Sequence, residues 1–278
     1  MPVIDCHQHF WTFGKRKHTF PPPVGNRLDR SFEPDDLRPE LKQAGVDGTI
    51  IVQSLNDLGE TEEFLGLQKS VDYVVGVVGW VPLDDPKACA AALDQVSTQG
   101  KLVGIRHLMN YEPDPAWLLQ PGVRESLGLL AKAGLVFEAI PVSDAQFESV
   151  LTVAREMPAL KIVLNHMGNP PVPEKGWEPW ATQIARAAEL RNVSVKLSPG
   201  LALVMRWKWS TDEIRRYADH TLGLFSPDRV MAGSNWPVVL LGGSFGEIWQ
   251  GLTDLLGGLT PTERAAVLGG TATRIYGL

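Results

Sequence analysis

Short apolar runs recur along the chain and alternate with longer segments whose apolar residues repeat at helical spacing. The runs are rich in Val, Ile and Leu and almost continuously apolar, which is typical of strands buried on both faces of a parallel sheet. We expect eight strands, at Val3–His9, Gly48–Gln53, Tyr73–Trp80, Leu102–His107, Leu135–Ile140, Lys161–His166, Val193–Ser198 and Arg229–Ser234. Amphipathic helices are expected between them, among others at Pro34–Gln43, Thr61–Ser70, Ala88–Thr98, Val123–Ala133, Asp144–Glu156, Pro179–Glu189 and Thr211–Leu224.

Eight strand and helix units in 278 residues predict a closed (β/α)8 barrel of the TIM type. The alternative is an open doubly wound sheet, which usually carries a glycine-rich phosphate turn after its first strand. The residues in that place are His7-Gln8-His9-Phe10-Trp11, which do not form such a turn.

No repeat, low-complexity tail or linker divides the chain, so we expect a single domain over residues 1–278. Two proline-rich stretches, Phe20–Val24 and Asn169–Pro173, follow the first and sixth predicted strands. We interpret both as loops that shape a pocket, because loops at the carboxyl ends of barrel strands build the active site.

Polar and aromatic residues gather at the carboxyl ends of the predicted strands. In the first strand His7 and His9 are two residues apart, so their side chains point to the same face. The residues at or near the eight strand ends are His7, His9, Trp11, Gln53, Trp80, Arg106, His107, Glu138, Asn165, His166, Lys196, Asn235 and Trp236.

These residue types have the chemistry of a catalytic or metal-binding pocket. Three imidazoles facing one cavity, those of His7, His9 and His166, can bind a divalent metal and leave a position open for water. Arg106 and Lys196 can hold a carboxylate or polarise a carbonyl oxygen. Flat apolar walls against which a substrate ring packs are expected from Trp11, Trp80 and Trp236.

Each residue also has a purely structural interpretation. A tryptophan at a strand end often only fills the core, and Lys196 can extend its ammonium group to solvent. Glu138 can be the internal ion-pair partner of Arg106, and His107 can bond backbone groups. The two remaining histidines, His18 in a basic loop and His220 on a helix, are given no functional role.

Composition narrows the function classes. Hydrophobic residues make up 44% and charged residues 21%, as in ordinary globular proteins. The net charge is −6, and the longest basic run is Lys15–Lys17, which does not favour binding to nucleic acid. Two cysteines form no disulfide framework, which favours a reducing, cytoplasmic compartment. Neither a signal peptide nor an apolar run of membrane-spanning length is visible.

Several short motifs resemble the amidohydrolase-related barrel lactonases, the family that contains L-fuconolactonase and L-rhamnonolactonase. The similarity runs from end to end, at residues 4–11, Val78-Gly79-Trp80-Val81, Gly104-Ile105-Arg106-His107, 166–170, Lys196-Leu197-Ser198, 233–237 and 273–278. The resemblance implies a distorted (β/α)8 barrel that opens the ring of a sugar-acid or related small lactone by attack of water on the ester carbonyl.

The resemblance also implies roles for individual residues. It assigns His7, His9 and His166 to a metal site, with zinc as the expected metal, or to its metal-free equivalent. It places Arg106 and His107 at the substrate carbonyl. Gln53, Trp80, Trp11, Lys196 and Trp236 are expected to bind the substrate.

Two positions depart from the family pattern. Asn165 and Asn235 stand where the family usually has aspartate, and the second aspartate activates the hydrolytic water. A neutral amide cannot take a proton from water, and it removes a negative charge that would help hold a cation. Three explanations are open: a deliberate Asp→Asn substitution, a natural enzyme whose base is Glu138 or a histidine, and a protein that only binds its ligand.

Two functions outside lactone hydrolysis remain as alternatives. One is a metal-dependent decarboxylase of a small aromatic acid, and the other is a non-catalytic ligand-binding protein on the same scaffold. The expected partner is a small-molecule lactone, with no nucleic acid and no membrane. The segment Arg206-Trp207-Lys208-Trp209 either caps the pocket or packs against a second subunit of a homo-oligomer.

Overall fold

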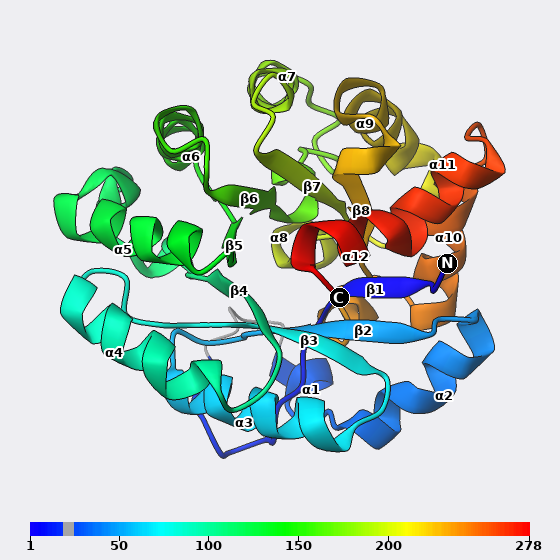
Figure 1. Ribbon diagram of the computed structural model, residues 1–278. Helices are drawn as coiled ribbons and strands as arrows, with labels where there is room; N and C mark the ends of the chain where they lie inside the picture. The colour runs from blue at the N-terminus through cyan, green and yellow to red at the C-terminus, as the bar shows by residue number, and fades with distance from the viewer. Residues whose placement is uncertain (19–24) are drawn as a thin grey trace.

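The computed structural model describes residues 1–18 and 25–278 of the chain, and eight parallel strands form its centre (Figure 1). They pair in chain order from β1 to β8. The strands are β1 (Ile4–Gln8), β2 (Gly48–Val52), β3 (Val74–Gly79), β4 (Leu102–Arg106), β5 (Val136–Ala139), β6 (Lys161–Leu164), β7 (Val193–Leu197) and β8 (Val230–Ala232). All eight predicted strands are confirmed, and the chain has the TIM-like α/β barrel expected from its sequence.

The barrel is completed where β1 meets the residues after β8. The backbone N–H of Asn235 donates to the carbonyl of His7 at 2.7 Å, and that of His9 donates to the carbonyl of Trp236 at 2.8 Å. Gly233 permits this approach, because a Cβ added there would lie 2.8 Å from the Cβ of His7. The first and last strands therefore deliver their end residues to the same place.

Helices surround the strands, and the seven predicted between them are present with ends shifted by at most three residues. The helices are α1 (Gly25–Leu28), α2 (Pro34–Ala44), α3 (Leu58–Ser70), α4 (Pro86–Ser97), α5 (Pro121–Lys132), α6 (Asp144–Glu156), α7 (Trp180–Ala188), α8 (Leu201–Val204), α9 (Thr211–Phe225), α10 (Phe245–Leu255), α11 (Pro261–Ala265) and α12 (Thr271–Tyr276). Short 3-10 turns comprise η1 (Met109–Tyr111), η2 (Trp117–Leu119), η3 (Asn165–Gly168), η4 (Pro227–Arg229) and η5 (Val238–Leu241), and η6 (Ala266–Gly270) is a π-helical turn.

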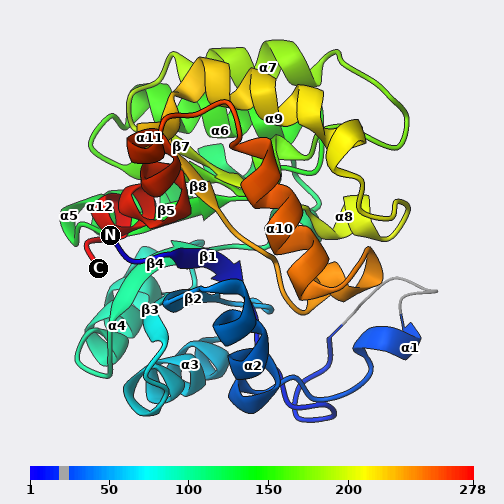
Figure 2. The ribbon, with the colours of Figure 1, turned by 90° about the vertical axis from the view of Figure 1, so that its right-hand side faces the viewer.

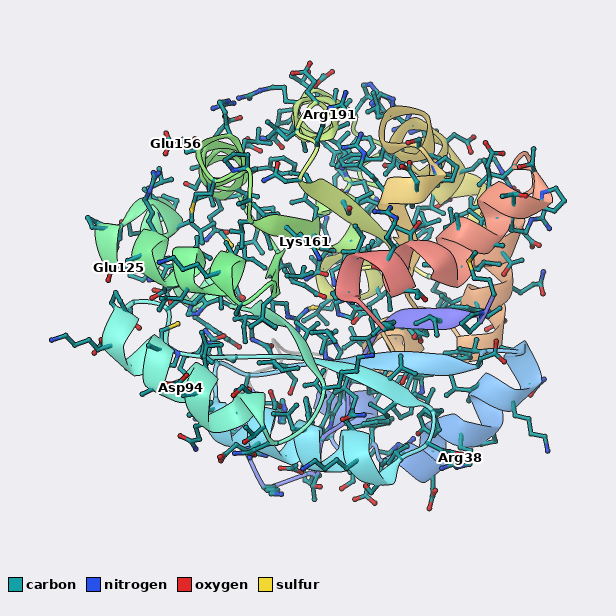
Figure 3. All side chains as sticks on the ribbon, in the orientation of Figure 1. Arg38, Asp94, Glu125, Glu156, Lys161 and Arg191 are labelled. Atoms are coloured by element: carbon teal, nitrogen blue, oxygen red, sulfur yellow. The ribbon has the colours of Figure 1, made fainter. Side chains whose placement is uncertain are left out.

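Side chains fix where several helices begin. Asp57 accepts a hydrogen bond from the backbone N–H of Glu60 at the start of α3, and Ser143 accepts one from Gln146 at the start of α6. These caps satisfy donors that a helix start leaves unpaired. The apolar faces of the helices then pack against the outside of the barrel, and charged side chains such as Arg38, Asp94, Glu125 and Glu156 lie on the outer faces (Figure 3).

The amino-terminal end of the barrel is packed by the last helix. Ala272 and Tyr276 of α12 belong to the same cluster of buried side chains as Ile4, Cys6 and Val163 of the strands. Both chain ends lie at this end of the molecule, whereas α1 and α8 lie at the opposite end (Figure 2). The carboxyl ends of the strands therefore face α8 and the long loops.

The sixth strand is shorter than predicted. The sequence indicated a strand to His166, but β6 ends at Leu164 and the chain enters η3. His166 and Met167 have φ values of 54° and 53°, in the left-handed region that a strand cannot adopt. The hydrophobic pattern did not predict this bend because Asn165 to Met167 are all buried, as strand residues would be.

Three further expectations concern composition and loops. Cys6 and Cys89 are buried and form no disulfide, as predicted. No helix in the described part of the chain is long and apolar enough to cross a membrane. The proline-rich stretch Phe20–Val24 lies outside the described residues, whereas Asn169 of the second stretch lines a cavity.

Candidate active site

A cavity of about 290 Å³ lies at the carboxyl ends of the strands. This volume is near the lower end of the range for small-molecule sites, roughly 300–1,000 Å³. The cavity is lined by His9, Trp11, His18, Ser54, Leu55, Arg106, Leu108, Asn110, Tyr111, Ile140, Val142, His166, Asn169, Leu201, Ala202, Met205, Asn235 and Val238. Five residues that the sequence analysis assigned to the site are therefore brought together here: His9, Trp11, Arg106, His166 and Asn235.

Asp5 holds the ends of β1 and β8 together beneath this cavity. Its carboxylate accepts hydrogen bonds from the backbone N–H of His7, and from the backbone N–H and hydroxyl of Ser234. Burial raises the pKa of Asp5 to about 6, although the bonds from Ser234 and His7 oppose that rise. This carboxylate fixes the backbone on which both histidines of β1 and Asn235 are mounted.

His7 and His9 project together, as the alternation of β1 predicted. Their Nε2 atoms are 3.2 Å apart. The Nδ1 of His9 donates to the carbonyl oxygen of Val52 at 2.7 Å, so neutral His9 carries its lone pair on Nε2. Burial, followed by the charge of Arg106, lowers the pKa of His9 to about 3, so this ring is neutral at pH 7.

The side chain of Asn235 has a fixed orientation. Its Nδ2 donates to the carbonyl of Pro199 at 2.8 Å, which turns Oδ1 to a position 3.1 Å from Nε2 of His9. The residue has φ of 60°, a left-handed conformation that asparagine tolerates better than most residues. The amide therefore presents an oxygen to the cavity in the place where the family pattern expects a carboxylate.

The two acceptor atoms Nε2 of His9 and Oδ1 of Asn235 suit a cation. Nε2 of His9 and Oδ1 of Asn235 are both acceptors at 3.1 Å, and Nε2 of His7 lies 3.2 Å from His9. Acceptors this close repel one another unless a positive charge lies beside them, and imidazole nitrogen with amide oxygen is a set that divalent metals accept. In the described part of the chain no three His, Cys, Asp or Glu side chains are placed to hold a metal, the expected set of His7, His9 and His166 included, so that set stays a prediction.

Arg106 supplies the positive charge on the cavity floor. One of its terminal nitrogens, Nη2, donates to the backbone carbonyl of Gln53 and to Oε1 of the same side chain, and Nη1 lies 3.3 Å from Nε2 of His7. Burial lowers the pKa of Arg106 to about 10, which still leaves the guanidinium charged at neutral pH. Gln53 therefore positions Arg106, and it does not itself line the cavity.

His166 reaches the cavity through the left-handed turn after β6. Its Nδ1 lies 2.8 Å from the hydroxyl of Ser198, and its ring centroid lies 4.6 Å from that of His7. Burial, followed by the charges of Arg106 and Lys196, lowers the pKa of His166 well below its usual value. A neutral imidazole with Nδ1 already bonded offers its Nε2 to a substrate or a water molecule.

The other predicted site residues do not line the cavity. Trp80 donates through Nε1 to Nδ1 of His107, whose Nε2 lies 2.6 Å from Glu112. Trp236 packs edge-on against Phe10 and Phe32. Six predicted residues lie beside or beneath the lining: His7, Gln53, Trp80, His107, Lys196 and Trp236. Their contact with a substrate stays a prediction, and the structure gives them contacts that position other side chains.

Lys196 and Glu138 form a buried ion pair, which differs from both structural interpretations of the sequence. Both side chains are fully buried, and Nζ of Lys196 lies 2.6 Å from Oε1 of Glu138. The Tyr276 hydroxyl donates to the same oxygen at 2.5 Å. Lys196 therefore does not reach solvent, and Glu138 pairs with Lys196 and not with Arg106.

Replacing Lys196 with methionine is expected to lower the free energy of unfolding by about 3–5 kcal/mol, because Glu138 is left as a buried charge without its cation. Urea unfolding followed by tryptophan fluorescence measures the change. The double variant Lys196→Met/Glu138→Gln is expected to recover much of that stability. An equal loss in the double variant would show that packing, and not the ion pair, is responsible.

A cluster that the sequence analysis left out lies on the cavity wall. His18, which was given no role, has its Nε2 2.8 Å from the hydroxyl of Ser54. That hydroxyl donates to the buried carboxylate of Glu60, which also accepts bonds from the backbone N–H groups of Ser54 and Leu55. Ser54 directly follows Gln53 at the end of the second predicted strand, and this place at a strand end could have indicated that Ser54 lies at the site.

The two tryptophans after β7 also lie outside the cavity lining. Trp207 donates to Glu213, and Trp209 donates to the hydroxyl of Thr211 at 3.1 Å. A Cβ added at Gly251 of α10 would contact the Trp209 ring, so this side chain packs against α10. Of the two alternatives for this segment, a cap over the pocket is not formed by these two rings, and packing against a second subunit stays a prediction.

The sequence profile of a known enzyme family, described as amidohydrolase, matches residues 4–278. This chain belongs to the amidohydrolase family. A curated relative from Burkholderia ambifaria, an L-fucono-1,5-lactonase, is 32% identical over 98% of this chain and 94% of the relative. A second L-fucono-1,5-lactonase, from Burkholderia multivorans, is 30% identical over 99% of this chain and 96% of that protein.

Solved structures of amidohydrolases agree with this assignment. An amidohydrolase from Burkholderia multivorans with bound zinc has a TM-score of 0.92 at 29% identity, with all of both chains covered. A dihydroxybenzoic acid decarboxylase from Polaromonas with bound manganese has a TM-score of 0.65 at 14% identity, over all of this chain and 97% of the other, which shows the shared fold alone. The chain is a hydrolytic enzyme of the amidohydrolase superfamily, and the decarboxylases are more distant.

Proposed function

We propose that this chain hydrolyses a lactone, with the ester carbonyl bound on the cavity floor against Arg106. The observation that carries the proposal is the floor itself, where a buried guanidinium lies beside neutral His7 and the acceptor atoms of His9 and Asn235. The lactonases among its relatives cover nearly the whole chain and support the same reaction.

Arg106 stabilises the charge that develops in the reaction. Attack of a water oxygen on the carbonyl carbon moves the carbonyl electron pair onto oxygen, and the guanidinium of Arg106, held by Gln53, lies on the floor to face that negative charge. Stabilisation by a fixed donor of this kind commonly contributes a hundredfold to a thousandfold in rate. No reorganisation of Arg106 is needed, because its contacts already hold it in place.

His166 takes the proton from the attacking water. No Asp or Glu side chain lines the cavity among the described residues, and the amide of Asn235 cannot act as a base. In the neutral tautomer whose Nδ1–H donates to the Ser198 hydroxyl, Nε2 of His166 carries the lone pair, accepts the proton and returns it to the ring alkoxide when the acyl C–O bond breaks.

A divalent metal fits the acceptor cluster described above. His7, His9 and Asn235 would hold it, and when bound it would lower the pKa of water and polarise the carbonyl. The amide of Asn235 contributes no negative charge, and Arg106 lies 3.3 Å from Nε2 of His7. The site therefore binds a dication more weakly than a site with a carboxylate in the same place.

Zinc affinity tests this assignment without any assay of activity. Asn235→Asp is expected to bind Zn²⁺ at least about tenfold more tightly than the unchanged protein, since it places a negative charge beside His9. Isothermal titration calorimetry on metal-free protein measures both affinities. Asn169→Asp is the matched control, because Asn169 lines the same cavity but does not contact His9. An equal gain in both variants would contradict the proposed ligand set.

Lactone hydrolysis is tested directly with a panel of lactones and a pH indicator, because ring opening releases one proton from each product acid. The panel is run with and without a chelator. Release of acid above the uncatalysed rate supports the proposal. Carbon dioxide release from a dihydroxybenzoate, with no lactone opened, would favour decarboxylation instead. Tight binding of a lactone without turnover, even in Asn235→Asp, would favour a ligand-binding protein.

A further inference from the structure

The cavity has two chemically different halves. Its floor is polar and charged, with His9, Arg106, His166 and Asn235. The apolar part of the lining comes from two regions of the chain, which are called the two walls here. Leu108, Ile140 and Val142 follow β4 and β5, while Leu201, Met205 and Val238 belong to or adjoin α8 and η5.

Exposed apolar side chains also gather at this cavity. Among the described residues four large hydrophobic side chains are exposed: Met1, Phe13, Tyr111 and Val142. Two of the four, Tyr111 and Val142, line the cavity, and Val142 is 55% exposed. Exposed apolar surface concentrated at a binding site commonly marks contact with an apolar ligand.

Two polar side chains of the lining, those of Asn169 and Ser54, are engaged by the protein. The Nδ2 of Asn169 donates to the carbonyl of Pro141, and the hydroxyl of Ser54 lies between His18 and Glu60. A substrate hydroxyl placed against Leu201, Met205 or Val142 would lose its bonds to water and gain none. Burying a polar group without a partner is unfavourable, whereas burying an alkyl group is favourable.

The charge of the lining also excludes acidic substituents. Arg106 is the one Lys or Arg side chain that lines the cavity in the described part of the chain, and its terminal nitrogens already contact Gln53 and His7. A substrate carboxylate placed against the apolar walls would therefore find no Lys or Arg partner among the described lining residues.

We infer that the substrate is a monocyclic lactone with a short alkyl substituent, its ester on the polar floor and its alkyl group between the apolar walls. This inference rests on the proposed lactone hydrolysis and names the substrate class within it. A cavity of about 290 Å³ accommodates one ring and a short chain.

Three lactones of equal ring size test the inference: δ-valerolactone, δ-octalactone, which adds a propyl group, and glucono-1,5-lactone, which is polyhydroxylated. The value of kcat/KM for each is divided by its uncatalysed rate of hydrolysis at the same pH. Each methylene that the walls cover is expected to raise the ratio about fourfold, so δ-octalactone, with three more carbons, exceeds δ-valerolactone by about sixtyfold. Glucono-1,5-lactone is expected to be the poorest of the three.

A matched pair of variants locates the effect. Met205→Gln places an amide of similar size in the wall and is expected to lower the octalactone-to-valerolactone preference at least about fivefold. Met157→Gln makes the same change at another half-buried methionine, at the end of α6 and outside the cavity, and is expected to leave the preference unchanged. Thermal unfolding followed by circular dichroism shows whether each variant is folded at the assay temperature.

The outcomes separate the inference from the proposed function. Faster hydrolysis of glucono-1,5-lactone than of δ-octalactone would overturn the alkyl substituent while lactone hydrolysis stands. An unchanged preference in Met205→Gln would also overturn it. If neither the unchanged protein nor Asn235→Asp opens any of the three rings, the proposed function fails and the inference fails with it.

Discussion

Replacing Asn235 with aspartate is expected to raise kcat/KM for lactone hydrolysis by two to four orders of magnitude. The side chain lies 3.1 Å from Nε2 of His9 and lines the cavity, so a carboxylate there would stand beside the substrate and accept the proton of the attacking water. A positioned general base commonly contributes a hundredfold to ten-thousandfold in rate. A pH-indicator assay on the lactone opened fastest by the unchanged protein measures the gain.

The same substitution is expected to reduce stability. Nδ2 of Asn235 donates to the carbonyl of Pro199, and an aspartate leaves that carbonyl without its donor. An unsatisfied buried acceptor costs about 1–3 kcal/mol, so the free energy of unfolding should fall while activity rises. Urea unfolding of both proteins measures the change. A gain in activity together with a loss of stability would show that the substitution acts on catalysis and not by stabilising the fold.

Asn169→Asp is the matched control for charge. Asn169 also lines the cavity, has φ of 59° against 60° for Asn235, and donates to a proline carbonyl, that of Pro141. It does not contact His9, so its carboxylate adds charge to the cavity without a place for the hydrolytic water. Equal gains in the two variants would mean that cavity charge alone limits the rate. No gain in either would show that the absence of a carboxylate at position 235 does not limit the rate.

The apolar runs and the amphipathic segments between them predicted the strands, the helices and the direction of the strand side chains. The β-branched runs gave all eight strands, and the two-residue spacing of His7 and His9 predicted that their rings lie together. The carboxyl-end rule for barrels then brought Arg106, His166 and Asn235 to the same cavity. These predictions succeeded because each follows from one strand or from one topological rule.

The partners of buried charges could not be predicted in this way. Lys196 bonds Glu138, and Glu138 accepts a bond from Tyr276, which is 138 residues away and belongs to a helix that packs against the barrel. A strand position gives the face of a side chain but not its depth in the barrel. His18 was missed for a related reason, since it lies in an irregular loop where no periodic pattern indicates direction.

Arg106 is expected to be the side chain whose loss reduces activity most. Arg106→Lys should lower kcat/KM by a hundredfold to a thousandfold, since a single ammonium cannot contact Gln53 and His7 together and also face the developing oxyanion. The fall should appear mainly in kcat, because the oxyanion forms only in the transition state. Steady-state kinetics on one lactone, with the substrate concentration taken well above KM, separates kcat from KM.

Two further variants make the result specific to this guanidinium. Arg106→Gln removes the charge and is expected to be at least as inactive as Arg106→Lys. Arg186→Gln removes a guanidinium of the outer surface, where Arg186 pairs with Glu148, and should leave kcat unchanged. Thermal unfolding must show Arg106→Lys folded at the assay temperature. If that folded variant keeps its kcat, Arg106 has no part in stabilising the oxyanion, and the donor must be sought among the other side chains that line the cavity.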